Sequence, residues 1–124
     1  MMDVSGAVME ASAPLASGER PIDLVHLARM TFGDRSLERE VLTLFDRQAG
    51  LLMARMEAAD PTAVLTIAHT LTGSARGIGA WRVARAAEAL ELACSTDEFG
   101  AALKALRAST DEARSVISEL LRAH

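Results

Sequence analysis

Apolar residues between positions 37 and 56 recur three and four positions apart, and this spacing constrains the fold more than any other feature. It matches one face of a helix with 3.6 residues per turn. The pattern predicts a long amphipathic helix that must bury its apolar stripe against other elements. The row consists of Leu37, Val41, Leu44, Phe45, Leu51, Leu52 and Met56, with Gln48 continuing the spacing.

Helix-start and helix-breaking residues divide the chain into five predicted helices. Asp23, Asp34 and Asp60 each precede an apolar run and are suited to accept the free N–H groups of a helix start. Pro61 fits the first helical position, where its missing N–H has no partner. The sequences "FGD" and "GIGA" interrupt the helical pattern. The predicted helices cover about residues 23–32, 34–59, 60–78, 81–93 and 99 onward.

The last predicted helix follows a candidate capping box, in which Ser95 and Glu98 of "STDE" satisfy each other's backbone N–H groups. Four amphipathic helices with short connections predict an all-α fold, an antiparallel four-helix bundle capped at one end by the short extra N-terminal helix. The apolar side of the last helix consists of Phe99, Leu103, Leu106, Ala113, Ile117, Leu120 and Leu121.

Composition supports this fold class and a single domain. The chain has 124 residues, is rich in Ala and Leu, and has only four aromatic residues, a balance that favours helices over sheets. Residues 1–20 are rich in Ser, Ala and Gly without a sustained period. They are predicted to form a flexible tail ahead of one helical domain at 21–124.

Charge and cysteine content exclude several classes of function. A net charge of −4 argues against general nucleic-acid binding. The single cysteine, Cys94, allows neither an internal disulfide nor a multi-cysteine metal site. No apolar run approaches the roughly 20 residues that span a bilayer, and no secretion signal is evident. We therefore expect a cytoplasmic monomer without membrane or nucleic-acid partners.

One histidine of the third predicted helix lies away from its apolar stripe. At about 100° per residue, His69 falls about 140° from Val64, on the same side as Thr66, Gly73 and Arg76. Glycine inside a helix costs about 1 kcal/mol relative to alanine. Clearing space beside the imidazole is one reason to accept that cost, and close packing against a neighbouring helix is another. The predicted buried stripe is Val64, Ala68, Leu71, Ala75 and Ile78.

The segment "AHTLTGSARGIGAWRVARAAEALE" resembles the signature of histidine phosphotransfer (HPt) domains of bacterial phosphorelays. That signature is His-x-Leu-Lys-Gly-Ser-Ala, a hydrophobic-Gly pair, and a helix that ends in Leu-Glu or Leu-Gln. The resemblance extends over about residues 21–121. The matching positions are His69, Leu71, Gly73, Ser74, Ala75, Ile78, Gly79, Ala80, Leu90 and Glu91.

The resemblance implies that His69 accepts a phosphoryl group from a receiver domain or a hybrid histidine kinase and passes it to a receiver aspartate. Neutral imidazole offers a ring nitrogen lone pair for attack on phosphorus. Glu91 is implied to orient the ring. The partner receiver is expected to bring the Mg²⁺, so the chain itself needs neither cofactor nor metal. Nothing resembles a nucleotide site, which favours a phosphocarrier over a kinase.

One position departs from the signature, because Thr72 replaces the usual lysine. Thr72 and Arg76 are predicted to contact the phosphate or the partner. The docking surface is predicted to include Leu65, Thr66, Gly73 and Arg82. The loss of lysine keeps two other hypotheses open. One is an HPt-like module that binds a receiver or kinase without being phosphorylated, and the other is a purely structural bundle. Asp23 and His26 have a metal-compatible spacing but lack the further ligands of a bundle metal site.

Overall fold

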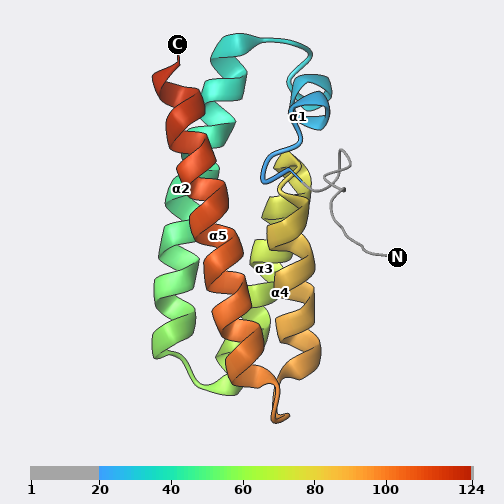
Figure 1. The fold of residues 1–124 in the computed structure, drawn as a ribbon, viewed down its shortest axis with the longest axis vertical. Coiled ribbons are helices and arrows are strands. Elements are labelled where there is room, and N and C mark those ends of the chain that lie inside the picture. Colours follow the sequence, from blue (N-terminus) through green and yellow to red (C-terminus); the bar gives the residue numbers. More distant parts are fainter. Residues whose placement is uncertain (1–19, 124) are drawn as a thin grey trace, which may run out of the picture.

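The computed structural model describes residues 20–123, which form five helices and, over that range, no strand (Figure 1). Four long helices alternate in direction and make an up-down-up-down bundle, and α1 lies at one end beside the α3–α4 corner. This confirms the predicted all-α fold. The predicted tail lies outside the described residues, apart from Arg20. The helices are α1 (Leu24–Met30), α2 (Arg35–Ala58), α3 (Pro61–Ile78), α4 (Trp81–Ala93) and α5 (Phe99–Arg122).

The three predicted aspartate caps are confirmed. The carboxylates of Asp23, Asp34 and Asp60 each accept the backbone N–H three residues further on, at 2.9 to 3.0 Å. Each cap satisfies one of the N–H groups that a helix start leaves without an intrahelical acceptor. The starts of α1, α2 and α3 are therefore determined by local sequence.

The prediction of a capping box before α5 is wrong. Ser95 adopts a φ of 68°, and neither Ser95 nor Glu98 caps the helix with its side chain. Thr96 takes over part of this role, because its hydroxyl accepts the N–H of Glu98 at 3.2 Å and donates to the carbonyl of Ala93 at 2.6 Å. The left-handed turn at Ser95 moves its hydroxyl away from the start of α5.

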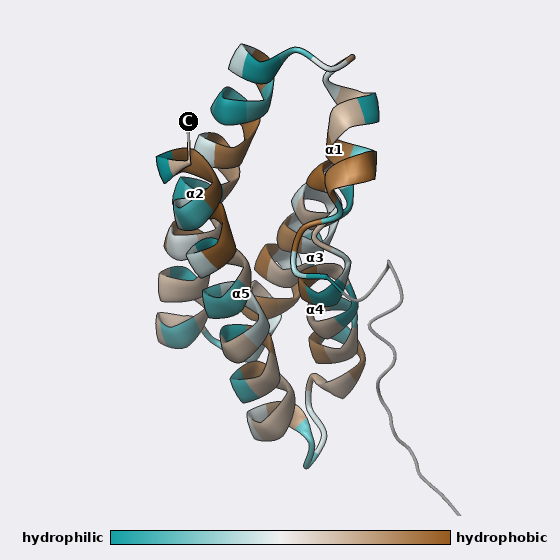
Figure 2. Ribbon diagram, turned by 45° about the horizontal axis from the view of Figure 1, so that its top comes forward, coloured by the Kyte–Doolittle hydropathy of each residue, from teal (hydrophilic) through white to brown (hydrophobic). Residues whose placement is uncertain are grey.

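The core lies along the bundle axis, where the apolar sides of the helices face one another (Figure 2). The predicted stripe of α3 is buried throughout, which confirms the helical phase of this segment. Alanines on both α3 and α4 are buried at their contact, and such small side chains let two helices approach closely. These alanines are Ala68, Ala75, Ala84 and Ala87.

The predicted stripe of α2 is only partly right. Leu44 and Leu51 are 62% and 61% exposed, and Leu37 is also exposed. Two apolar rows lie side by side on α2, and together they are wider than the face that α3 and α5 cover. We call the uncovered row of Leu37, Leu44 and Leu51 the α2 leucine row. The row that packs in the core is Leu42, Phe45, Ala49, Leu52, Met53 and Met56.

A small polar cluster fastens α1 to the corner between α3 and α4. Asp23 accepts the indole N–H of Trp81 at 2.9 Å and donates its own N–H to the carbonyl of Gly79 at 2.9 Å. Nε2 of His26 lies 3.1 Å from the carbonyl oxygen of Gly77, and the His26 ring meets Trp81 edge-on. We call Asp23, His26 and Trp81 the α1 latch. Asp23 and His26, whose spacing is compatible with a metal site, therefore hold α1 against the corner between α3 and α4.

Acidification is expected to loosen the α1 latch. The indole N–H of Trp81 and the backbone N–H of His26 hold the pKa of Asp23 below its ordinary value of 3.8. The folded-state pKa is depressed, so this stabilisation is complete above the ordinary value and is lost as pH falls through the folded value. Trp81 is the only tryptophan, and its fluorescence should change in that acidic range. The Asp23→Asn variant should lack the transition; an unchanged transition in that variant would exclude Asp23 as its source.

Gly79 is required at this corner for two reasons. Its φ is 84°, in the left-handed region that glycine adopts without strain. A Cβ at Gly79 would also lie 3.1 Å from both the Cβ and the carbonyl oxygen of Asp23. Gly79, the glycine of the hydrophobic-Gly pair, thus ends α3 and leaves room for Asp23 at the start of α1.

One buried polar atom lacks a partner among the described residues. Thr110 of α5 is fully buried, and its hydroxyl makes no hydrogen bond. Removing an unsatisfied buried hydroxyl without changing side-chain shape avoids a desolvation cost of about 1–3 kcal/mol. We expect Thr110→Val to raise the free energy of unfolding by about 1 kcal/mol in urea denaturation. A loss of stability would mean that the hydroxyl has a partner.

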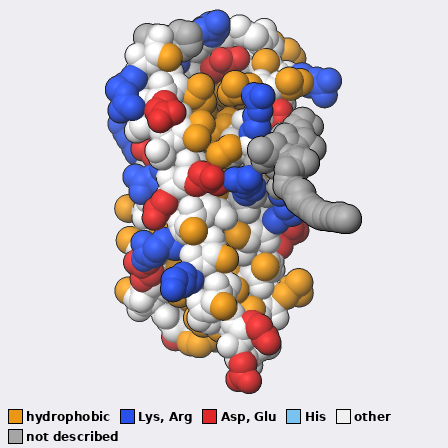
Figure 3. Space-filling view, viewed as in Figure 1, with side chains coloured by type: hydrophobic (Ala, Val, Ile, Leu, Met, Phe, Trp, Pro, Cys, Tyr) orange, Lys and Arg blue, Asp and Glu red, His pale blue; other side chains and the backbone are white. Residues whose placement is uncertain are grey.

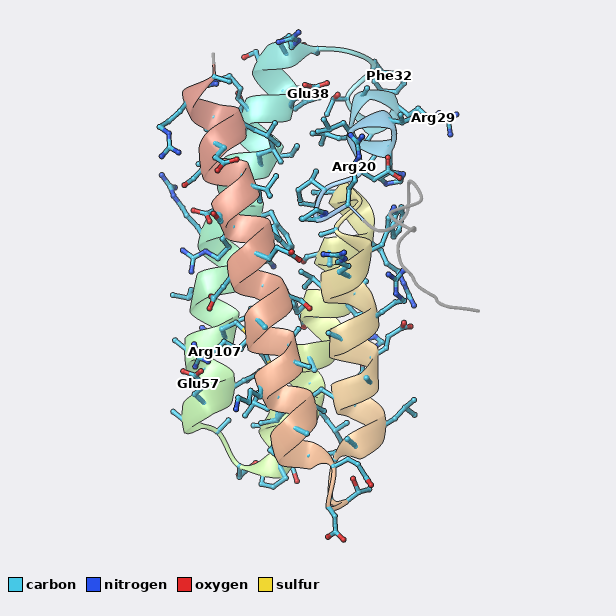
Figure 4. All side chains as sticks on the ribbon, in the orientation of Figure 1. Arg20, Arg29, Phe32, Glu38, Glu57 and Arg107 are labelled. Atoms are coloured by element: carbon cyan, nitrogen blue, oxygen red, sulfur yellow. The ribbon has the colours of Figure 1, made fainter. Side chains whose placement is uncertain are left out.

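The face formed by α5 and its neighbours carries intermixed acidic and basic side chains (Figure 3). Ion pairs join α5 to α2. One is between Arg107 and Glu57 (Figure 4), and the other is between Arg114 and Asp46. Over residues 20–123, no helix is both long and apolar enough to cross a membrane.

Candidate functional site

His69 stands in the middle of α3 with its side chain 81% exposed. Its Nδ1 atom lies 3.4 Å from Oε1 of Glu91 on α4. The structure thus confirms that the imidazole lies outside the core and brings it to the glutamate that the sequence signature singles out. A distance of 3.4 Å is long for a hydrogen bond, so the two groups are close without being tightly bonded.

The contact with Glu91 distinguishes the two ring nitrogens. A carboxylate beside Nδ1 favours the tautomer that carries the proton there. The lone pair then belongs to Nε2, the ring nitrogen that does not face Glu91. Of the two ring nitrogens of His69, Nε2 is therefore the better nucleophile.

Thr72 faces Glu91. Its side chain is 3% exposed, and its hydroxyl is directed to two acceptors, the carbonyl of Ala68 at 3.0 Å and Oε2 of Glu91 at 3.3 Å. The hydroxyl lies between α3 and α4. Thr72 lines the same groove as His69, but its hydroxyl is already directed at a carbonyl and a carboxylate, so its direct contact with phosphate or partner stays a prediction.

Arg76 contacts Glu88 across the α3–α4 groove, at an ion pair between two partly exposed side chains. The predicted contact of Arg76 with the phosphate or the partner stays a prediction: Arg76 lines the same groove as His69, and its guanidinium is paired with the carboxylate of Glu88. The open groove has a volume of about 390 Å³. It is lined by His69, Thr72, Arg76, Glu88, Glu91 and Leu92.

Gly73 leaves open space one turn after His69. A Cβ built at Gly73 meets no other atom within 4 Å, so this glycine is not needed for close packing against another helix. Leu65 and Thr66 are exposed one turn before the histidine. At Gly73, one turn after His69, α3 therefore carries no side chain that could cover the imidazole.

Arg82 lies away from this groove, contrary to its predicted place in the docking surface. Nine residues separate it from Glu91, which puts the two on opposite sides of α4, about 180° apart. Its guanidinium donates to Glu112 of α5 at 2.7 Å. Arg82 joins α4 to α5 and does not border His69.

Sequence reasoning missed three contributors to this surface. Glu88 pairs with Arg76, and Leu92 is highly exposed at the end of the groove. The third is the α2 leucine row, where Leu44 borders a shallow pocket shared with Ser74 of α3. The three-residue spacing from Glu88 to Glu91 signals that they share a helix face. The apolar spacing of α2 predicts that its leucines belong to the core, so only the structure reveals them as surface residues.

Residues 20–123 contain no group of three or more His, Cys, Asp or Glu side chains placed to hold a metal ion. The polar groups that line the groove are an exposed imidazole, two carboxylates, a paired guanidinium and the hydroxyl of Thr72. An imidazole in this setting can form a bond to an electrophile that another molecule presents.

A comparison with known protein families matches residues 35–123 to the Hpt domain. No curated protein and no solved structure matches the chain. Hpt domains act in phosphorelays, where they exchange phosphoryl groups with receiver domains and kinases. The match extends over most of the chain and includes α2 to α5, with the exposed histidine and its glutamate. The chain belongs to the Hpt domain family.

Proposed function

We propose that the chain is a cytoplasmic, monomeric phosphocarrier in which His69 accepts a phosphoryl group from a receiver or hybrid kinase and passes it to a receiver aspartate. The observation that carries this proposal is the exposed imidazole whose Nδ1 atom faces Glu91. That arrangement leaves Nε2 open to a partner's active site.

The transfer step uses few groups of this chain. The lone pair of Nε2 attacks the phosphorus of an aspartyl phosphate on the partner. The P–O bond to the aspartate breaks, its electron pair stays on the carboxylate, and a P–Nε2 bond forms. The imidazole of His69 keeps its Nδ1 proton and becomes cationic, and the carboxylate of Glu91 stabilises that charge. Phosphoryl transfer depends mainly on positioning and charge stabilisation, so such a site suffices.

The groove has little positive charge of its own to balance a phosphoryl group. Arg76 is paired with Glu88, and Glu91 adds a second carboxylate close to His69. The guanidinium charge is thus offset before any phosphate arrives. We expect the receiver to supply the cations that balance the transferring phosphoryl group, including the Mg²⁺ of its own active site.

The proposed docking surface surrounds His69 on two helices. Leu65, Thr66 and Gly73 of α3 border the imidazole, and the α2 leucine row extends the surface with exposed apolar side chains. Exposed leucines two helical turns apart, one of them bordering α3 at Ser74, offer apolar area that a protein partner can bury. We propose that a partner whose active site covers the histidine also buries leucines of this row.

A second candidate function is that of an interaction module that binds receivers or kinases without accepting phosphate. The absence of the usual lysine favours it, because Thr72 brings no positive charge to the groove. The two functions share the docking surface and differ only in the chemistry at His69.

A labelling assay separates these functions. Receiver domains charged with ³²P-acetyl phosphate are incubated with the chain, and binding is measured in parallel by isothermal calorimetry. We expect an acid-labile, alkali-stable label on the chain within minutes. Binding without label would favour the interaction module, and neither binding nor label across a genome's receivers would contradict both.

A further inference from the structure

We propose that Thr72 is a positioning residue that sets the tautomer of His69 through Glu91. The proposal rests on the proposed function only for its consequence, the rate of transfer. The contacts on which it is based, from Thr72 to Glu91 and from Glu91 to His69, can be tested in the unphosphorylated protein.

The two oxygens of Glu91 face different neighbours. Oε2 lies 3.3 Å from the hydroxyl of Thr72, and Oε1 lies 3.4 Å from Nδ1 of His69. A glutamate side chain has three rotatable bonds and loses entropy when it is held in one orientation. The hydrogen bond from Thr72 restrains the carboxylate plane, so that its other oxygen stays directed at the imidazole.

Thr72 is itself well placed to act as an anchor. It lies in the buried part of α3, and its hydroxyl also reaches the carbonyl of Ala68 one turn earlier. A β-branched side chain in a helix has few rotamers. The single hydroxyl proton is shared between the carbonyl of Ala68 and the carboxylate of Glu91, so the donor oxygen is held in place on α3, whereas Glu91 itself is partly exposed on α4.

A neutral donor at this position has a physical advantage over the family's usual lysine. A lysine ammonium beside Glu91 would offset the negative charge of the carboxylate. The Thr72 hydroxyl orients the carboxylate and leaves its charge in place. Glu91 can then stabilise the Nδ1 proton of His69, both in the resting ring and in the phosphorylated, cationic ring.

The proposal is tested by the tautomer of His69, read from ¹⁵N chemical shifts and ring proton couplings in histidine-labelled protein without any phosphoryl donor. The test variant is Thr72→Val, which keeps the shape of the side chain and removes the hydroxyl. Thr72→Ser restores the hydroxyl. The matched control is Thr70→Val on the same helix, because the Thr70 hydroxyl donates to the carbonyl of Thr66 and lies on the exposed surface.

We expect the Nδ1–H tautomer to dominate in the wild type, Thr72→Ser and Thr70→Val, and the Nε2–H tautomer to grow severalfold in Thr72→Val. The transfer rate of Thr72→Val should fall about fivefold, the equivalent of one hydrogen bond of about 1 kcal/mol. Thr72→Ala serves as a second hydroxyl-free variant if the valine variant loses helicity, and it should show the same shift.

Unchanged tautomer populations in both hydroxyl-free variants would overturn the positioning role. So would an equal shift in Thr70→Val, since that change leaves Glu91 untouched. Failure of the proposed function is distinguishable: the wild type would then take no label from any receiver while its His69 tautomer still responded to Thr72.

Discussion

Replacing His69 by Gln is expected to reduce phosphoryl acceptance to background while leaving the fold intact. An amide nitrogen is not a nucleophile, so the variant has no atom that can replace Nε2. The His69 side chain makes no core contact, because it is 81% exposed. Substitutions at such positions usually change stability by no more than about 0.5 kcal/mol. Transfer from a ³²P-charged receiver and thermal unfolding by circular dichroism measure the two effects.

A matched control for this variant is His26→Gln. The His26 ring is half-buried in the α1 latch, where Nε2 lies at the carbonyl of Gly77, so the ring is much less accessible to a partner than that of His69. We expect normal labelling of His26→Gln, together with some loosening of α1. Label that persists in His69→Gln would place the acceptor on another residue and exclude His69 as the phosphorylation site.

The second large effect is expected for Gly73→Leu, which should slow transfer at least tenfold and strengthen the helix. A helical side chain lies over the turn that precedes it, so a leucine at this position would cover the surface beside His69. A tenfold loss of affinity corresponds to about 1.4 kcal/mol. Leucine is a better helix former than glycine by roughly 0.8 kcal/mol, and the open space at Gly73 accepts it without a clash.

This prediction is specific because Gly73→Leu should weaken binding of the partner and at the same time raise the stability of the fold. Gly100→Leu is the matched control, since Gly100 also faces open space and lies on α5, diagonal from α3 in the bundle. That variant should transfer at the wild-type rate. Calorimetric affinity for a receiver, measured beside the unfolding transition, separates docking from folding. Normal transfer by Gly73→Leu would contradict the view that a partner closes over this turn.

Local signals explain how much of the fold was predictable. The aspartate caps act within three residues, so the starts of α1, α2 and α3 follow from the sequence. The stripe of α3 is a single apolar row, and its phase is therefore unambiguous. On α2 two adjacent rows are apolar, and the row that packs in the core depends on where α3 and α5 lie. The leucine row could not be recognised before the bundle was assembled.

Some features of the site could also be predicted from the sequence, and others could not. The exposure of His69 follows from helical phase, and the place of Glu91 follows from the family signature. The orientations of Thr72, Arg76 and Arg82 depend on carboxylates of other helices, at Glu91, Glu88 and Glu112. Such partners are set by tertiary packing, and a helical wheel of one segment contains no information about them.

The position of phosphorus on the imidazole decides whether His69 carries the phosphoryl group in the proposed way. The chain is labelled with ¹⁵N-histidine and phosphorylated by a charged receiver, and the ³¹P–¹⁵N coupling identifies the bonded nitrogen. We predict phosphorus on Nε2 of His69, because Nδ1 faces Glu91. Phosphorus on Nδ1, or on any residue other than His69, would contradict the proposed mechanism.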